Sequence, residues 1–228
     1  MSKHAPKPAL KPALPAHAPR RNSHRRANNA ARAAPLPKHE TPPELDYVRH
    51  KVCIVDPPWT FLTRSTKGKK KNPKYDVMTF DELRALRPTV SALMERKSVM
   101  LMWSTAPHLK QAMTLLAEWG FEYKSYMIWK KDKAATGYWA RSNCEIILVA
   151  TRGQPGAPKA GTQSLSVFEG KPLEKKHSSK PDFLHKWVEK HYGDATKLEL
   201  FARRKRESWT TLGGDLGTFI TPTGIVTK

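Results

Sequence analysis

The chain has 228 residues, which is enough for one domain of ordinary size and an additional arm. Its 41 lysines and arginines against 20 acidic residues give a formal net charge of +21, which predicts a polyanionic partner. The only two cysteines, Cys53 and Cys144, exclude a disulfide framework and a cysteine-rich zinc site. The apolar runs are too short to span a membrane and no secretory signal is visible, so we expect a soluble intracellular protein without membrane contact.

Residues 1–46 form a basic arm of low complexity. The first forty residues contain nine lysines and arginines and one acidic residue, among alternating alanines and prolines. Because this composition cannot bury a hydrophobic core, we expect the arm to be disordered until it meets a partner. Nucleic-acid binding, solubilisation and targeting all remain open as its role.

The next segment, residues 52–59, joins a short apolar strand to a stiff turn. Four apolar residues run directly into Asp56-Pro57-Pro58-Trp59. Neither proline can donate a ladder hydrogen bond and both fix φ, so the strand must end here, with the acid at its carboxyl end. Ligands of open α/β sheets bind just outside the carboxyl ends of strands, so this turn is a candidate ligand site.

The residue types of this turn suit the methylation of a planar amine. An amino group on a nucleobase is a poor nucleophile because its lone pair is delocalised into the ring. The Asp56 carboxylate and the Pro57 carbonyl would accept its two N–H groups and favour a pyramidal nitrogen, and the two prolines would hold these acceptors rigidly. Trp59 would stack on an unstacked base. Each residue alone is more often structural, but together we interpret Asp56, Pro57, Pro58 and Trp59 as catalytic.

The rest of the chain alternates between predicted helices and strands. A lysine-rich loop over residues 61–75 is either solvated or steers phosphates toward the site. A capping box at Thr79–Glu82 opens a helix that Pro88 interrupts. The expected strands cover residues 99–103, 121–131, 144–150 and 197–202, and a mobile loop covers residues 152–176. The expected later helices run from Pro107 to Gly120, with Leu109, Ala112, Met113 and Leu116 inward, and from a cap at residues 178–181 to Gly193. This alternation predicts an α/β protein with a mostly parallel sheet.

Taken in order, these segments resemble the N6-adenine methyltransferase family that includes the catalytic subunit of the messenger-RNA adenosine methyltransferase. The resemblance runs from about residue 47 to residue 217, and residues 137–153 look most like bacterial and phage members. It rests on Asp56-Pro57-Pro58-Trp59, Trp129-Lys130, Gly137-Tyr138-Trp139 leading to Glu145, Thr151-Arg152-Gly153, Ser179-Lys180-Pro181, residues 198–203 and residues 209–215.

The resemblance implies a Rossmann-like fold over residues 47–220, with helices on both faces of the sheet and a C-terminal tail over residues 221–228. The motif order would be permuted, with the catalytic strand first and the cofactor strand last. It implies S-adenosylmethionine as cofactor and no metal. The expected cofactor-binding residues are Asp56, Lys180, Glu199, Arg203 and Asp215. The expected substrate-binding residues are Tyr75, Lys69, Lys70, Trp129, Trp139, Arg141 and Glu145. The Gly213-Gly214-Asp215 turn departs from the family, which usually carries an asparagine after the first glycine.

From these residues and the resemblance we expect methyl transfer from S-adenosylmethionine to the 6-amino group of adenine in nucleic acid. We expect DNA rather than RNA, in the cytoplasm or at the nucleoid of a bacterial or phage-infected cell, with a homodimer or heterodimer left open. The alternatives are an RNA adenosine N6-methyltransferase, methylation of a different amine such as that of cytosine or a protein side chain, and a catalytically inactive nucleic-acid-binding partner subunit.

Overall fold

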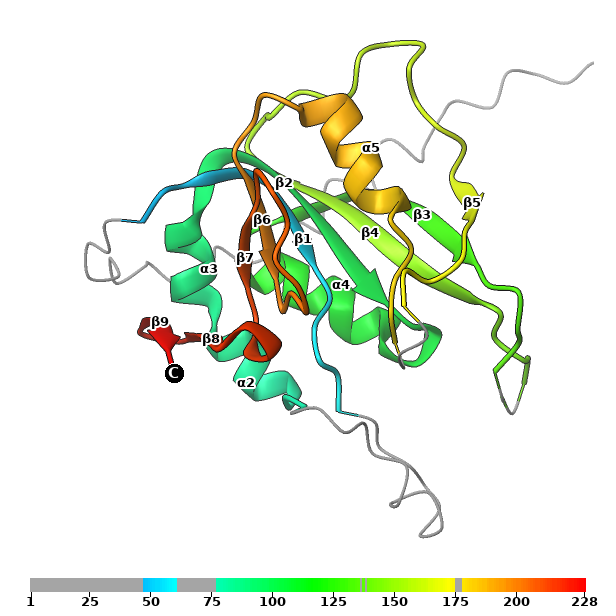
Figure 1. The fold of residues 1–228 in the computed structure, drawn as a ribbon, viewed down its shortest axis with the longest axis horizontal. Helices are drawn as coiled ribbons and strands as arrows, with labels where there is room; N and C mark the ends of the chain where they lie inside the picture. The colour runs from blue at the N-terminus through cyan, green and yellow to red at the C-terminus, as the bar shows by residue number, and fades with distance from the viewer. Residues whose placement is uncertain (1–46, 61–76, 136, 138, 175–177) are drawn as a thin grey trace, which may run out of the picture. The chain divides into compact units, whose positions relative to one another are not determined.

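A computed structural model describes residues 47–60, 77–135, 137, 139–174 and 178–228, which all belong to one compact unit (Figure 1). The basic arm and the predicted substrate residues Lys69, Lys70 and Tyr75 lie outside the described residues. The core is a seven-stranded sheet in the order β5-β3-β4-β2-β1-β6-β7. Its strands are β1 (His50–Val55), β2 (Met94–Ser104), β3 (Glu122–Lys130), β4 (Cys144–Arg152), β5 (Val167–Glu169), β6 (Lys197–Leu200) and β7 (Thr210–Leu212).

The expected α/β fold with a mostly parallel sheet is confirmed. Strand β1 pairs parallel with β2 and β6, β6 with β7, and β3 with β5. Strand β4 pairs antiparallel with both of its neighbours, β2 and β3. Within the described residues β4 is the one strand of this sheet that runs in the opposite direction, so it begins where its neighbours end.

Helices cover both faces of the sheet, also as expected (Figure 1). One face carries α2 (Phe80–Ala85), α3 (Arg87–Leu93) and α4 (Leu109–Glu118), and the other carries α5 (Phe183–Tyr192). Strand β1 serves both cores: Cys53 and Val55 pack toward the first three helices, and Val52 and Ile54 pack toward α5. Each such buried aliphatic side chain contributes about 1.5–3 kcal/mol. The central strand is therefore firmly held, and the turn that follows it has a rigid base.

Local signals place several of these helices correctly. Thr79 and Glu82 form both hydrogen bonds of the predicted capping box at the start of α2. Pro88 lies in the first turn of α3, which begins there as a separate helix. The prediction that Met113 faces the core is wrong, because it is 43% exposed while Leu115 is buried. A 3-10 turn, η2 (Ala106–His108), precedes α4, whose buried residues follow the helical spacing 112, 115, 116.

Other elements differ from the sequence-based expectations. Helix α5 begins only after Asp182 and has no side-chain cap bond, so residues 178–181 precede the helix and do not cap it. Strand β5 lies inside the predicted loop over residues 152–176, and strand β7 was not expected. The predicted tail is largely part of a hairpin, formed by β8 (Thr218–Thr221) and β9 (Gly224–Thr227). Strands of three or four residues are too short for a periodic pattern to reveal them.

No helix in the described part of the chain is long and apolar enough to cross a bilayer.

Candidate active site

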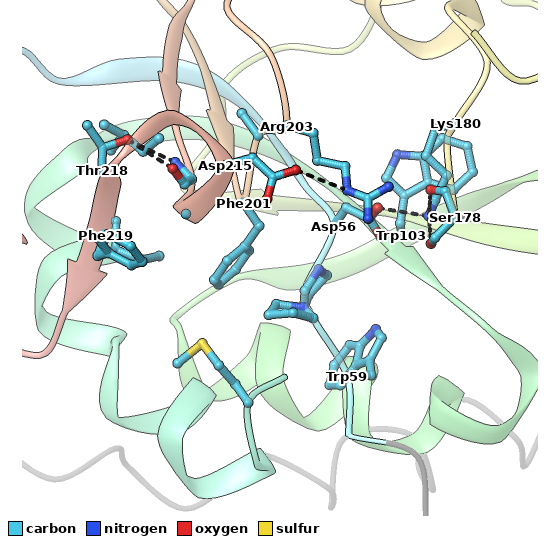
Figure 2. A pocket seen from close by; sticks show the side chains of 18 of the residues that line it. Asp56, Trp59, Trp103, Ser178, Lys180, Phe201, Arg203, Asp215, Thr218 and Phe219 are labelled. Atoms are coloured by element: carbon cyan, nitrogen blue, oxygen red, sulfur yellow. Dashed lines mark hydrogen bonds and ion pairs between the residues drawn. The ribbon is translucent and has the colours of Figure 1, made fainter. Parts of the chain in front are cut away.

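A cavity of about 900 Å³ opens at the edge of the sheet where β1, β2, β3, β6 and β7 end (Figure 2). Its volume lies toward the upper end of the range of about 300–1,000 Å³ for ligand pockets. Residues that follow directly after these strands line it, as expected for an open α/β sheet. They include Asp56 after β1, Thr105 after β2, Lys131 after β3, Phe201 after β6 and Gly213 after β7.

The Asp56-Pro57-Pro58-Trp59 turn forms one wall of the cavity. The Trp59 amide donates to the Pro57 carbonyl oxygen at 2.9 Å, and the Met78 amide donates to the Pro58 carbonyl oxygen at 2.8 Å. These bonds tie the turn to itself and to a second segment of the chain. A carbonyl oxygen has two lone pairs, so that of Pro57 can still accept a hydrogen bond from a ligand.

Trp59 packs into the wall of the cavity and not across its opening. It is 6% exposed, and its indole stacks on the imidazole of His108 with the ring centroids 5.3 Å apart and the planes inclined by 10°. The imidazole in turn lies 2.9 Å from the Thr105 hydroxyl and 3.3 Å from the Thr60 carbonyl oxygen. Burial lowers the pKa of His108, which keeps the ring neutral near pH 7. His108 covers one face of the Trp59 indole. A base could therefore stack only on the other face, and this stacking stays a prediction.

Glu145 reaches the same site because β4 is reversed. It is the second residue of β4, and an antiparallel strand begins at the edge where its neighbours end. Lys180 Nζ lies 2.8 Å from Asp56 Oδ2 and 3.3 Å from Glu145 Oε2. Lys131 Nζ lies 3.1 Å from Glu145 Oε1. Asp56, which follows β1, and Glu145, in β4, thus share the Lys180 ammonium group at the cavity wall.

The Lys180 ammonium is enclosed on several sides, with 14% of its side chain exposed. It donates to the hydroxyl and the carbonyl oxygen of Ser178, at 3.2 and 3.3 Å, and lies 5.4 Å from the centre of the Trp103 ring. Burial by itself would lower the pKa of Lys180, but Asp56 and Glu145 outweigh it, so the pKa is raised. Burial raises the pKa of Asp56, and Lys180 offsets this only in part.

The raised pKa of Asp56 predicts a pH dependence for any reaction in which its carboxylate accepts a hydrogen bond. The carboxylate must be ionised for this role, so the acidic limb of kcat/KM, which reports the free enzyme, will lie above the ordinary aspartate value of 3.8. Rates of methyl transfer measured across pH, at constant ionic strength, check this. A kcat/KM that stays constant down to about pH 4 would contradict it.

The opposite part of the cavity lies where β6 and β7 end. Phe201, directly after β6, has a φ of 62°, a left-handed conformation that is rare outside glycine. Arg203 Nε lies 3.9 Å from Asp215 Oδ2 across this part of the cavity (Figure 2). A Cβ on Gly213 would come within 2.0 Å of the Ala202 carbonyl oxygen, so only glycine fits where these two segments meet.

The predicted site residues divide clearly in the structure. Those that line the cavity are Asp56, Pro57, Pro58, Trp59, Glu145, Lys180, Arg203 and Asp215. Glu199 does not line it, because its side chain points toward α5 and lies 2.9 Å from His185 Nε2. Trp129 is a core residue, 3% exposed, whose indole donates to the Gly170 carbonyl oxygen at 2.9 Å. Trp139 and Arg141 are exposed and lie outside the cavity lining, so their contact with substrate stays a prediction.

Sequence reasoning missed several cavity residues. Trp103, Lys131 and Phe201 lie at or just after the ends of predicted strands, so the rule for carboxyl ends of strands could have identified them. Ser178 and Phe219 carried no such signal, because the first precedes a helix and the second lies in the unexpected hairpin.

Comparison with known proteins gives one family match and several relatives. The MT-A70 family model matches residues 50–215. The type II methyltransferase M.MunI of Mycoplasma sp is 27% identical over 198 residues, which cover 78% of this chain and 82% of that protein. The human N(6)-adenosine-methyltransferase catalytic subunit METTL3 is 27% identical over 176 residues, 72% of this chain and 28% of that protein. The Arabidopsis thaliana N(6)-adenosine-methyltransferase MT-A70-like is 27% identical over 175 residues, 72% of this chain and 23% of that protein.

Proposed function

The chain belongs to the MT-A70 family of adenine N6-methyltransferases, and we propose that it methylates the 6-amino group of adenine in DNA with S-adenosylmethionine as the methyl donor. The observation that carries this proposal is the position of Asp56. Asp56 and Pro57 belong to one braced turn, and both line a cavity of about 900 Å³.

The residues of the cavity suit S-adenosylmethionine. The cavity combines a cationic part at Lys180 with an aromatic and apolar part at Phe201 and Phe219, as an amino acid joined to a nucleoside requires. Asp215 supplies a carboxylate near the second part, where ribose hydroxyls need acceptors. Lys180 would hold the carboxylate of the cofactor, although it already binds Asp56 and Glu145, so the ligand would join or replace one of these ion pairs.

In the proposed reaction the protein orients the adenine amine and accepts its charge. Bound S-adenosylmethionine would supply an electrophilic methyl group on its sulfonium. Asp56 and the Pro57 carbonyl would accept hydrogen bonds from the two amine hydrogens and direct the nitrogen lone pair toward that methyl. Forming the N–C bond while the S–C bond breaks would leave a neutral thioether and would place positive charge on the nitrogen beside the Asp56 carboxylate. Asp56 or water would then accept one proton from this nitrogen.

One observation favours DNA as the substrate, and it is the extent of the match to the type II methyltransferase. The net charge of +21 suits a phosphate backbone of either kind. The match to the type II methyltransferase extends over most of that protein, whereas the chain spans only about a quarter of the N(6)-adenosine-methyltransferases that it matches.

Transfer of tritiated methyl groups to matched oligonucleotides tests the proposal. DNA and RNA of the same base sequence would be offered in single- and double-stranded form, with each adenine replaced in turn. We expect label in DNA that disappears when one particular adenine is replaced.

Label in RNA alone would make the protein an RNA adenosine methyltransferase. Label that survives replacement of every adenine would point to a different amine. Binding of nucleic acid without any transfer, together with no binding of S-adenosylmethionine in isothermal titration, would support the inactive partner subunit.

A further inference from the structure

The β8–β9 hairpin forms a wall of the cavity, although it lies beyond residues 50–215, where the family match ends. Its residues Thr218, Phe219, Ile220, Thr221 and Val226, and the adjacent Lys228, all line the cavity. In Figure 2, Thr218 and Phe219 lie on the opposite side of the view from Ser178 and Lys180, with Phe201 and Asp215 between them. The hairpin therefore encloses the part of the cavity that lies away from Lys180.

Several contacts fix the hairpin to the methyltransferase domain. The Thr89 hydroxyl of α3 donates to the Thr221 carbonyl oxygen, and the Ile225 amide donates to the Tyr47 hydroxyl at 3.0 Å. Ile220 and Ile225 pack against the core that lies beneath α2, α3 and α4. These contacts make the hairpin an ordered wall with a defined position on the domain.

Phe219 occupies the space above the turn that departs from the family pattern. A Cβ on Gly214 would lie 3.2 Å from Phe219 Cε1, so a side chain there would crowd the ring. Lys228 Nζ lies 5.1 Å from the centre of the same ring and holds it from another direction. An aromatic ring from the hairpin thus lies directly beside Gly214.

We propose that Phe219 is a nucleoside-binding residue of this protein, which contacts the adenine of the methyl donor from the β8–β9 hairpin. This inference rests on the cofactor proposed above. The amino-acid part of the donor must lie near Lys180 and its methyl group near Asp56, so its nucleoside extends toward the aromatic part of the cavity. There Phe219, Phe201 and Ile220 provide the apolar surface that a nucleobase needs.

Isothermal titration with two ligands tests this assignment without any turnover. S-adenosylhomocysteine contains both the nucleoside and the amino acid, and 5′-methylthioadenosine contains the nucleoside alone. We expect Phe219→Ala to weaken both ligands by the same factor, about tenfold, because loss of one stacking contact with a base costs about 1–3 kcal/mol. Thr227→Ala is the matched control, since Thr227 is exposed on the same hairpin and does not line the cavity.

Gly214 supplies an independent arm of the experiment. Gly214→Ala should also weaken both ligands, by less than Phe219→Ala does, because its methyl group crowds the Phe219 ring and makes it shift slightly. The double variant should bind no worse than Phe219→Ala alone, because the ring that the methyl crowds is then absent. Additive losses in the double variant would contradict the coupling.

The outcomes separate this inference from the proposed function. If the wild-type protein binds neither ligand nor S-adenosylmethionine, the proposed cofactor is wrong. If the wild-type protein binds and Phe219→Ala binds within twofold of it, the assignment of Phe219 is wrong. If only binding of DNA changes, the hairpin belongs to the substrate site, which also overturns the assignment. Should Phe219→Ala fail to fold, Phe219→Leu retains the bulk of the ring without its flat face and is read in the same way.

Discussion

Asp56→Asn is expected to lower kcat for methyl transfer by about 10³-fold, the loss typical when a preorganised group that stabilises developing charge is removed. The amide has almost the same size as the carboxylate, so the braced turn keeps its shape. It carries no negative charge and cannot take up a proton as the amine becomes cationic. Tritiated-methyl transfer under saturating conditions measures the loss.

The same variant should remain folded, and this separates catalysis from stability. The Lys180 ammonium keeps Glu145 and both oxygens of Ser178 as partners when Asp56 loses its charge. Asp81→Asn is the matched control, because Asp81 is an exposed carboxylate on α2 that pairs with Arg84 and does not line the cavity. Near-normal turnover by Asp56→Asn would rule out the proposed mechanism, and equal losses in both variants would point to a general effect of the substitution.

Lys180→Met is expected to have the largest effect on stability, a loss of about 3 kcal/mol in the free energy of unfolding near neutral pH. Removal of one partner from a buried ion pair leaves an uncompensated charge, and that costs about 3–5 kcal/mol. Here two carboxylates, Asp56 and Glu145, lose a shared cation, while Lys131 still contacts the second of them and Asp56 is in part solvated. Chemical denaturation measures the change.

The pH dependence of this loss is a second signature. Without Lys180 the pKa of Asp56 rises further above that of the unfolded chain, so the folded state binds a proton more readily. The stability deficit should therefore be largest near neutral pH and should shrink as the pH falls toward about 4.

Lys186→Met provides the control. Lys186 is exposed on α5, and its Nζ lies 3.6 Å from Asp182 Oδ2 in an i, i+4 ion pair. A pair of this kind is worth about 0.3–0.5 kcal/mol. If the deficit of Lys180→Met equals that of the control, or does not change with pH, the shared ion pair does not stabilise the fold.

What the sequence determined by itself is local. The capping box of Thr79 and Glu82 depends on residues three positions apart, and the prolines at positions 57 and 58 set their own backbone angles, so both features follow from the chain alone. The Asp56-Pro57-Pro58-Trp59 turn, the strand before it and the Rossmann-like alternation of helices and strands are of this kind. The family resemblance, which uses the same motifs, is confirmed by the match over residues 50–215.

The tertiary structure decided which side chains meet. Glu145 and Asp56 contact the same Lys180 ammonium because β4 runs antiparallel to its neighbours. In a parallel β4, Glu145 would lie at the opposite edge of the sheet. The described residues between β3 and β4, namely 131–135, 137 and 139–143, contain no helix, whereas a parallel connection needs a long crossover that usually contains one. Glu199 binds His185 and Trp129 enters the core because each side chain takes the face that the pleat of its strand gives it. The hairpin strands were too short to show a pattern, and only their packing on residues far away in the sequence, such as Thr89 and Tyr47, brings Phe219 to the cavity.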